Sequence, residues 1–164
     1  MTPQSHSALL QWQRVELLVE QWLGERQQLL RLLDQLRLGC RAQPTPPLLD
    51  RQVQAFCQLL IDYISAGYFE VYRELAEQAR HVRGGNPAAI ARLLRQLDDS
   101  TDAALRFNDE FEGAPAGLPA ISQLATGLGT LTDKLEERFA LEDQLIVSIH
   151  QREVPAARPQ LAVH

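Results

Sequence analysis

Three side chains on one predicted helix, Asp62, Ser65 and Phe69, have the types and the spacing of a protein-docking face. The stretch from Val53 to Leu75 repeats apolar residues at helical spacing, and these residues define its buried side. At about 100° per residue, the carboxylate, the hydroxyl and the ring lie roughly opposite that side. Exposed aromatic rings beside hydrogen-bonding groups are typical of binding hot spots. The competing interpretation is that another helix of a bundle covers this face.

The sequence offers few groups for catalysis or metal binding. A di-iron carboxylate bundle needs Glu-x-x-His on two helices, and none of the four histidines has a glutamate three residues before it. There is no G-x-x-x-x-G-K phosphate loop, and no serine or cysteine has the signature of an activated nucleophile. Glu142 and Asp143 are adjacent carboxylates, but neighbours on a helix point about 100° apart and do not easily share one reacting atom. We therefore expect no enzyme, no metal and no cofactor.

The composition favours one folded domain, over residues 1–154, followed by a frayed tail over residues 155–164. The chain has 164 residues, of which 45% are hydrophobic, so it can bury a core and is not disordered. No apolar run approaches about 18 residues and no secretory pattern opens the chain, so we expect a cytoplasmic protein without a membrane span. Cys40 and Cys57 match neither a metal site nor a disulfide framework, which fits the same compartment.

Charge is unevenly distributed along the chain. Residues 1–97 carry 11 basic and 9 acidic side chains, whereas residues 98–164 carry 5 and 12, which accounts for the net charge of −5. An acidic half repels nucleic acid and suits a basic protein partner. The arginines are dispersed and no recognition helix is evident, so direct DNA binding is not expected. The plainer interpretation is that acidic residues on a bundle surface serve solubility.

Four long amphipathic segments with two linkers and one tight turn predict an all-α, antiparallel four-helix bundle with long helices. The expected helices cover residues 5 or 7 to 38, 50 to 84, 87 to 111 and 121 to 149. Gly39 should stop the first helix, and Asp50 should cap the second. Asn86 followed by Pro87 should open the third.

Three apolar stripes carry this prediction, because each repeats at helical spacing. On the first helix the stripe is Val15, Leu18, Val19, Trp22, Leu29, Leu33 and Leu36. On the second it is Val53, Phe56, Leu60, Ile64, Gly67, Val71 and Leu75. On the fourth it is Ile121, Leu124, Leu128, Leu131, Leu135, Phe139, Leu145 and Ile149.

Three segments together resemble one known family. They are LVEQWLGERQQLL (Leu18–Leu30), FCQLLIDYISAGYFEVY (Phe56–Tyr72) and LEERFALEDQLI (Leu135–Ile146). The sequence is similar, over nearly the whole chain, to the regulator-of-sigma-D family, also called Rsd or AlgQ. The central motif FCQxLxDYxSAGxFxxY is long and unusual, which makes a chance match a poor explanation. Many members of the family carry His at the position of Tyr68.

The resemblance implies an all-helical, cytoplasmic anti-sigma factor. Family members bind the housekeeping sigma factor of bacterial RNA polymerase at its region four, which otherwise reads the −35 promoter element. The chain would then block the promoter and core-polymerase contacts of sigma and free polymerase for alternative sigma factors. One branch of the family is named for a positive effect on alginate synthesis. The family motif assigns sigma binding to Asp62, Ser65, Ala66 and Phe69.

These implied roles have a physical basis. Region four is a helix-turn-helix module that must be basic where it grips phosphates. Asp62 would accept a charge-assisted hydrogen bond from a sigma arginine or lysine, and Phe69 would supply a desolvated anchor. The small side chains of Ser65 and Ala66 would let a sigma helix approach closely. Trp22 is also a motif residue, but it lies in a core stripe and is interpreted as structural.

Two other classes of function remain open. A non-catalytic scaffold could self-associate through the Phe69 face, although we favour a monomer. Sizing the free protein against its complex with sigma would separate these two classes. A bundle enzyme that binds a metal or small molecule is the third class, and the missing ligand motifs argue against it.

Overall fold

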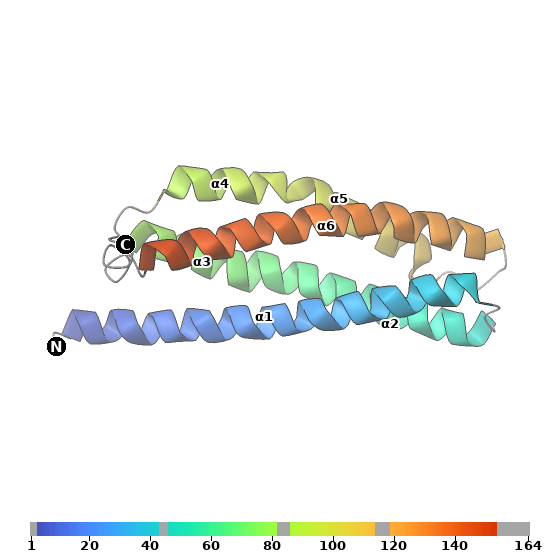
Figure 1. Cartoon of the computed structure of the whole chain (residues 1–164), viewed down its shortest axis with the longest axis horizontal. Helices are drawn as coiled ribbons and strands as arrows, with labels where there is room; N and C mark the ends of the chain where they lie inside the picture. Colours follow the sequence, from blue (N-terminus) through green and yellow to red (C-terminus); the bar gives the residue numbers. More distant parts are fainter. Residues whose placement is uncertain (1–2, 43–45, 82–85, 114–118, 154–164) are drawn as a thin grey trace, which may run out of the picture.

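Long helices that run antiparallel to one another make up the chain. The structure, a computed structural model, describes residues 3–42, 46–81, 86–113 and 119–153. The first and last segments are unbroken helices, α1 (Pro3–Arg41) and α6 (Pro119–Glu153). The middle two are divided, into α2 (Pro46–Ala66), η1 (Gly67–Val71) and α3 (Tyr72–His81), and into α4 (Pro87–Gln96) and α5 (Asp98–Phe111). The described ranges hold no strand, and Figure 1 shows the segments alternating in direction, which confirms the predicted all-α bundle.

The predicted stripes meet in one continuous core. All seven stripe residues of the second segment are buried, and Phe56 and Leu60 have no exposed surface. Trp22 is only 2% exposed, which confirms its structural assignment. In the other two stripes, three side chains are half-buried: Leu18, Ile121 and Phe139. The side chain of Ile149 is not among those that the structure describes. Each fully buried large apolar side chain contributes roughly 1.5–3 kcal/mol to folding before entropy is counted.

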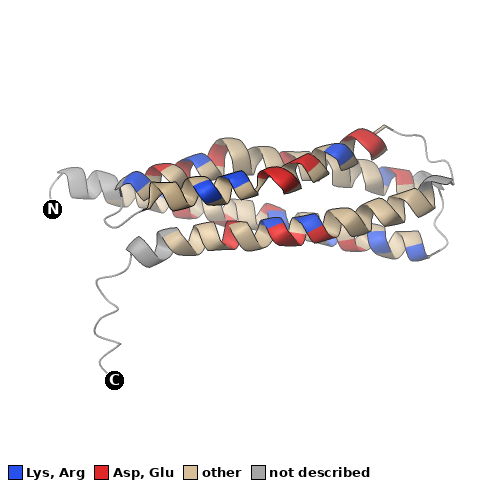
Figure 2. Ribbon diagram, turned by 90° about the horizontal axis from the view of Figure 1, so that it is seen from above, with Lys and Arg blue, Asp and Glu red and all other residues tan. Residues whose placement is uncertain are grey.

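The helices close a ring of four contacts. α1 packs on α2, α2 on α5, α5 on α6, and α6 on α1. α3 extends beyond α2 and packs against α4 and α6. Figure 2 shows that, among the residues it colours, α6 carries its charged residues in its middle, between two uncharged stretches.

Two predicted helix boundaries are wrong. Gly39 does not stop α1, which continues to Arg41. A glycine ends a helix when it adopts a positive φ, and among the described residues only Gly113 does so, at 73°. Asp50 is not an N-cap, because α2 already begins at Pro46. Proline suits that position, since the first turn of a helix has no use for its missing N–H.

The predicted third helix begins as expected but is divided. The Asn86 side-chain oxygen accepts the Ala89 N–H at 3.1 Å, which is the predicted cap. At Leu97 the N–H donates to the Leu94 carbonyl at 3.2 Å, so the helix tightens and breaks there. The Ser100 hydroxyl donates to the Leu97 carbonyl at 2.9 Å and opens α5. The break ends α4 at Gln96, and α5 begins at Asp98.

Several other expectations concern absences or the chain ends. No helix in the described ranges is long and apolar enough to cross a membrane. No group of three or more His, Cys, Asp or Glu side chains among the described residues is placed to hold a metal ion. Cys40 and Cys57 are free thiols. The tail 155–164 and the predicted helix end at Gly84–Gly85 lie outside the described residues.

A π-helical turn, η1, interrupts the second segment. The Tyr72 N–H donates to the Gly67 carbonyl, five residues back instead of four. Such a turn inserts one residue into the helix. The consecutive residues Tyr68, Phe69 and Glu70 within the turn are all exposed. The sequence did not predict this turn, because the apolar stripe passes through it without any irregularity.

Candidate protein-binding face and the polar network beneath it

The predicted docking residues lie along α2 and η1, where Asp62 and Phe69 are exposed and Ala66 packs partly against the core. Asp62 is exposed, and its Oδ1 accepts a hydrogen bond from Gln58 Nε2 at 3.1 Å. Ser65 and Ala66 are half-buried in the middle of the face. Phe69 is 68% exposed, so no described helix covers its ring. We call these four residues, Asp62, Ser65, Ala66 and Phe69, the Phe69 face.

A row of aromatic rings connects the Phe69 face to the interior. The ring of Phe69 meets that of Tyr68 at 6.0 Å between centroids and 60° between planes. Tyr68 is 47% exposed and in turn meets the ring of Tyr72 at 6.1 Å. Tyr72 is buried, so the row leads from solvent into the core. The Phe69 ring therefore packs against Tyr68, and most of its surface stays exposed.

Two carboxylates that sequence reasoning missed flank the Phe69 face, Glu25 on α1 and Glu70 on η1. Burial, followed by the charges of Glu70 and Asp62, raises the pKa of Glu25. Glu25 Oε2 is also buried without a hydrogen-bond partner. The three carboxylates thus form one negative region. Its charge comes from the N-terminal half of the chain, and not from the acidic C-terminal half that the sequence singled out.

An open groove runs beside Phe69, between α1 and the η1–α3 part of the second segment. Its lining residues are Arg14, Leu18, Phe69, Glu70, Arg73, Glu74 and Glu77. Arg14 Nη2 pairs with Glu74 Oε2 at 3.2 Å, and both side chains are partly exposed. Exposed ion pairs of this kind contribute little to stability. The groove therefore combines two apolar side chains, Leu18 and Phe69, with charged side chains of both signs.

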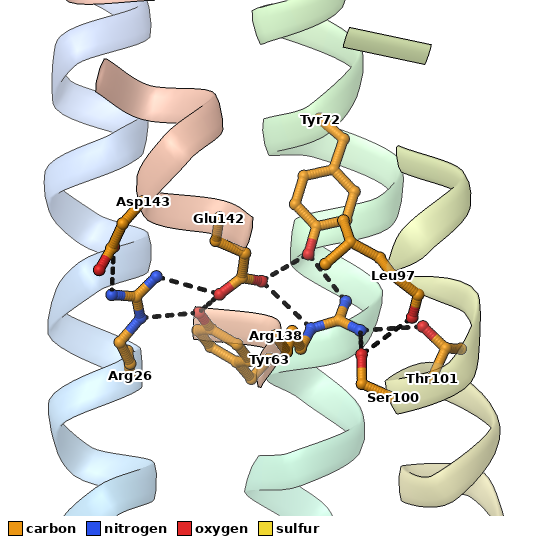
Figure 3. Close-up of polar contacts among 9 residues, drawn as sticks. All are labelled: Arg26, Tyr63, Tyr72, Leu97, Ser100, Thr101, Arg138, Glu142 and Asp143. Carbon is orange, nitrogen blue, oxygen red and sulfur yellow. Dashed lines mark hydrogen bonds and ion pairs between the residues drawn. The ribbon is translucent and has the colours of Figure 1, made fainter. Parts of the chain in front are cut away.

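Beneath the Phe69 face lies a buried polar network centred on Glu142 (Figure 3). Glu142 Oε1 accepts hydrogen bonds from the Tyr63 hydroxyl at 2.6 Å and from Arg26 Nη2 at 3.0 Å. Its Oε2 accepts from the Tyr72 hydroxyl at 2.5 Å and from Arg138 Nε at 3.1 Å. Glu142 and Arg138 have no exposed surface at all. A buried carboxylate of this kind is tolerated because both oxygens are fully partnered.

The two arginines extend the network to the remaining helices. Arg26 Nη1 donates to Asp143 Oδ1 at 2.8 Å, near the surface. Arg138 Nη1 donates to Ser100 Oγ at 3.0 Å and to Thr101 Oγ1 at 2.9 Å, just beyond the break in the third segment. Each guanidinium also donates to the neighbouring tyrosine oxygen, at 3.1 and 2.8 Å. All four helical segments are therefore tied together at one level.

Three side chains of the network, Tyr63, Tyr72 and Arg26, stay protonated. Burial, and then the charge of Glu142, raises the pKa of the Tyr63 and Tyr72 hydroxyls, so both remain donors. Burial alone would lower the pKa of Arg26, but its partners Tyr63, Asp143 and Glu142 raise it above its usual value. These groups do not exchange protons in the physiological range. The network therefore holds the helices together and has no general acid or base among these three side chains.

The network was missed in the sequence, although a signal for it was present. Arg138 and Glu142 lie between Leu135 and Leu145 at helical spacing, which places them on the core stripe of α6. Charged residues on a core stripe indicate buried ion pairs. Glu142 and Asp143 do not converge on a reacting atom; each binds a different nitrogen of Arg26.

Comparison with known proteins gives one consistent result. A family model described as "Regulator of RNA polymerase sigma(70) subunit, Rsd/AlgQ" matches residues 1–150. The "Regulator of sigma D" of Pectobacterium atrosepticum is 30% identical over 135 residues, which cover 81% of this chain and 88% of that protein. The protein of the same name from Yersinia enterocolitica is 28% identical over 131 residues, covering 79% and 78%. No solved structure matches the chain significantly.

Proposed function

The chain belongs to the Rsd/AlgQ family of regulators of the RNA polymerase sigma(70) subunit, and from this premise we propose that it is an anti-sigma factor. It binds region four of the housekeeping sigma factor through the Phe69 face. The observation that carries this proposal is the 68% exposure of the Phe69 ring on the same face as Asp62. Phe69 also meets the ring of the exposed Tyr68 at 6.0 Å, and an exposed apolar patch of this kind marks an interaction site.

Phe69 acts as the anchor of the complex. Its exposed ring lines the groove between α1 and the η1–α3 part of the second segment, where a sigma helix can reach it. Aromatic anchors that become fully desolvated carry most of the energy of an interface. The surrounding polar side chains then form the rim that excludes water.

The carboxylates of this region select a basic partner. Asp62 accepts one hydrogen bond, from Gln58, and keeps its other lone pairs available to a sigma arginine or lysine. Glu25 and Glu70 add negative charge beside it. A helix-turn-helix module that binds DNA phosphates is basic on the matching surface. Opposite charges on the two proteins speed encounter and fix their relative orientation.

The outcome for transcription is occlusion. While region four is bound here, it cannot contact the −35 element or the core polymerase, and alternative sigma factors gain access to core enzyme. The protein acts as a monomer in the cytoplasm, where the polymerase is, and it has no direct contact with DNA. In this proposal the chain is a regulator and not an enzyme.

The proposal is tested by titrating the purified full-length chain with purified housekeeping sigma factor and with its isolated region four. We expect a complex with both, which light scattering after size exclusion would detect. Leu105→Ala is the matched control for Phe69→Ala, because Leu105 is an exposed apolar residue on α5, away from this face. Absence of any sigma complex would refute the proposal. A homodimer that depends on Phe69 would instead favour the self-associating scaffold.

A further inference from the structure

The π turn and the buried Glu142 network meet at one residue, Tyr72. Its backbone N–H donates to the Gly67 carbonyl and closes the π turn. Its hydroxyl donates to Glu142 Oε2 at 2.5 Å and accepts from Arg138 Nη2 at 2.8 Å. The exposed Phe69 lies between the two ends of that turn. The buried carboxylate and the exposed anchor are therefore connected through a single side chain.

The spacing of Tyr63 and Tyr72 explains why the turn is needed. The two residues are nine positions apart, and in a regular α-helix they would point about 180° away from each other. A π turn inserts one residue, which reduces this angle to about 80°. Only then can both hydroxyls reach the same carboxylate, as they do at 2.6 and 2.5 Å.

Gly67 removes the remaining steric obstacle. A Cβ atom at this position would lie 3.2 Å from the ring carbon Cζ and the hydroxyl of Tyr72, and 3.3 Å from the Trp22 ring. These distances are shorter than ordinary van der Waals contacts, so a larger residue would push the Tyr72 ring away. A glycine here lets the ring lie close against its own helix and point at Glu142.

We propose that the hydrogen bond between Tyr72 and Glu142 holds the π turn that presents Phe69, which makes both of them positioning residues for partner binding. The inference rests on the proposed sigma-binding function. Without this bond the segment returns toward a regular helix, whose hydrogen bonds have better geometry. The residues after the turn then rotate relative to Asp62 and Ser65. The groove residues Arg73, Glu74 and Glu77, which follow the turn, then no longer line one groove with Phe69.

The test compares Tyr72→Phe with Tyr63→Phe. Each variant removes one buried hydroxyl that donates to Glu142 and accepts from an arginine, so we expect both to lose similar stability to urea. Only Tyr72 closes the π turn. Affinity for sigma region four should therefore fall roughly tenfold in Tyr72→Phe and less than about twofold in Tyr63→Phe. Equal losses of affinity in the two variants would overturn the inference.

A measurement on the free protein separates this inference from the proposed function. Amide hydrogen exchange of residues 68–72 should be faster in Tyr72→Phe than in Tyr63→Phe at matched global stability, because the turn has lost its tether. Gly67→Ala should have the same effect, although it removes no hydrogen-bonding group. If the wild type does not bind sigma, the proposed function fails while this result still stands. Unchanged exchange in both Tyr72→Phe and Gly67→Ala would overturn the inference.

Discussion

The Phe69 face and the Glu142 network use similar side chains for opposite purposes. Each combines carboxylates with aromatic residues, and the second helical segment contributes to both. Glu142 has four hydrogen-bond donors within the protein, whereas Asp62 has one, from Gln58. The carboxylate that stabilises the fold is thus saturated, and the one on the face retains capacity for a partner. Satisfaction of polar groups, rather than residue type, distinguishes the structural region from the binding region.

The largest expected effect comes from breaking the network. Glu142→Ala leaves Arg26 and Arg138 without their shared carboxylate, so the free energy of unfolding should fall by about 3–5 kcal/mol. Asp143→Ala is the control, since Asp143 is 59% exposed and also binds Arg26, and it should cost less than about 1 kcal/mol. Urea unfolding measures both. Similar losses of unfolding free energy in the two variants would mean that the burial of Glu142 does not make it more important for stability than the exposed Asp143.

The next effect separates the two regions by affinity. Phe69→Ala should change the free energy of unfolding by less than about 0.5 kcal/mol and weaken sigma binding by about 2 kcal/mol or more. Phe56→Ala, at a position with no exposed surface, should instead cost about 3–5 kcal/mol of stability. Thermal unfolding and sigma titration on the same samples check this. A large stability loss in Phe69→Ala would place Phe69 in the core.

A smaller effect concerns the pKa of Glu25, which folding raises through burial and the charges of Glu70 and Asp62. A raised pKa in the folded state means that the stabilising contribution of Glu25 is present at low pH and is lost as pH rises through the folded value. Glu25→Gln should therefore gain stability relative to wild type as the pH rises above the ordinary pKa of a glutamate. It should also bind sigma more weakly. A stability difference that does not vary with pH would contradict the first expectation.

The smallest effect is expected at an exposed ion pair. Lys134 Nζ lies 2.6 Å from Asp99 Oδ2, and this hydrogen bond lowers the pKa of Asp99. Solvent screens this pair, so Asp99→Asn should leave the melting temperature almost unchanged. Calorimetry at low and high salt would check this. A clear loss of stability at either salt concentration would show that exposed ion pairs matter here as much as the network does.

The sequence predicted the helices and their buried sides because apolar spacing reports directly on both. The stripe from Val53 to Leu75 is buried throughout, and Phe69 is exposed on the opposite side as its position on the helix requires. Gly39 and Asp50 misled the boundary predictions, since a residue type permits a cap without enforcing one. The sigma-binding roles of Asp62, Ser65, Ala66 and Phe69 stay predictions.

The negative region around Glu25 and the π turn were not predicted, because both depend on which helices pack against each other. Glu25 belongs to the negative region only because α1 packs beside α2, and one sequence does not give that pairing. The π turn depends on Glu142, which lies 70 residues after Tyr72 in the chain. Local spacing contains no information on such a distant partner.

The saturation of Glu142 also constrains how this protein can evolve. Replacing a whole buried ion network by well-packed apolar residues is often neutral or stabilising, so the apolar alternative is itself a viable fold. Each single substitution toward the apolar core, however, leaves a buried charge without its partner. A lineage can reach that alternative only by changing Arg26, Arg138 and Glu142 almost together. Each intermediate sequence is therefore expected to be less stable than either the intact network or a fully apolar core.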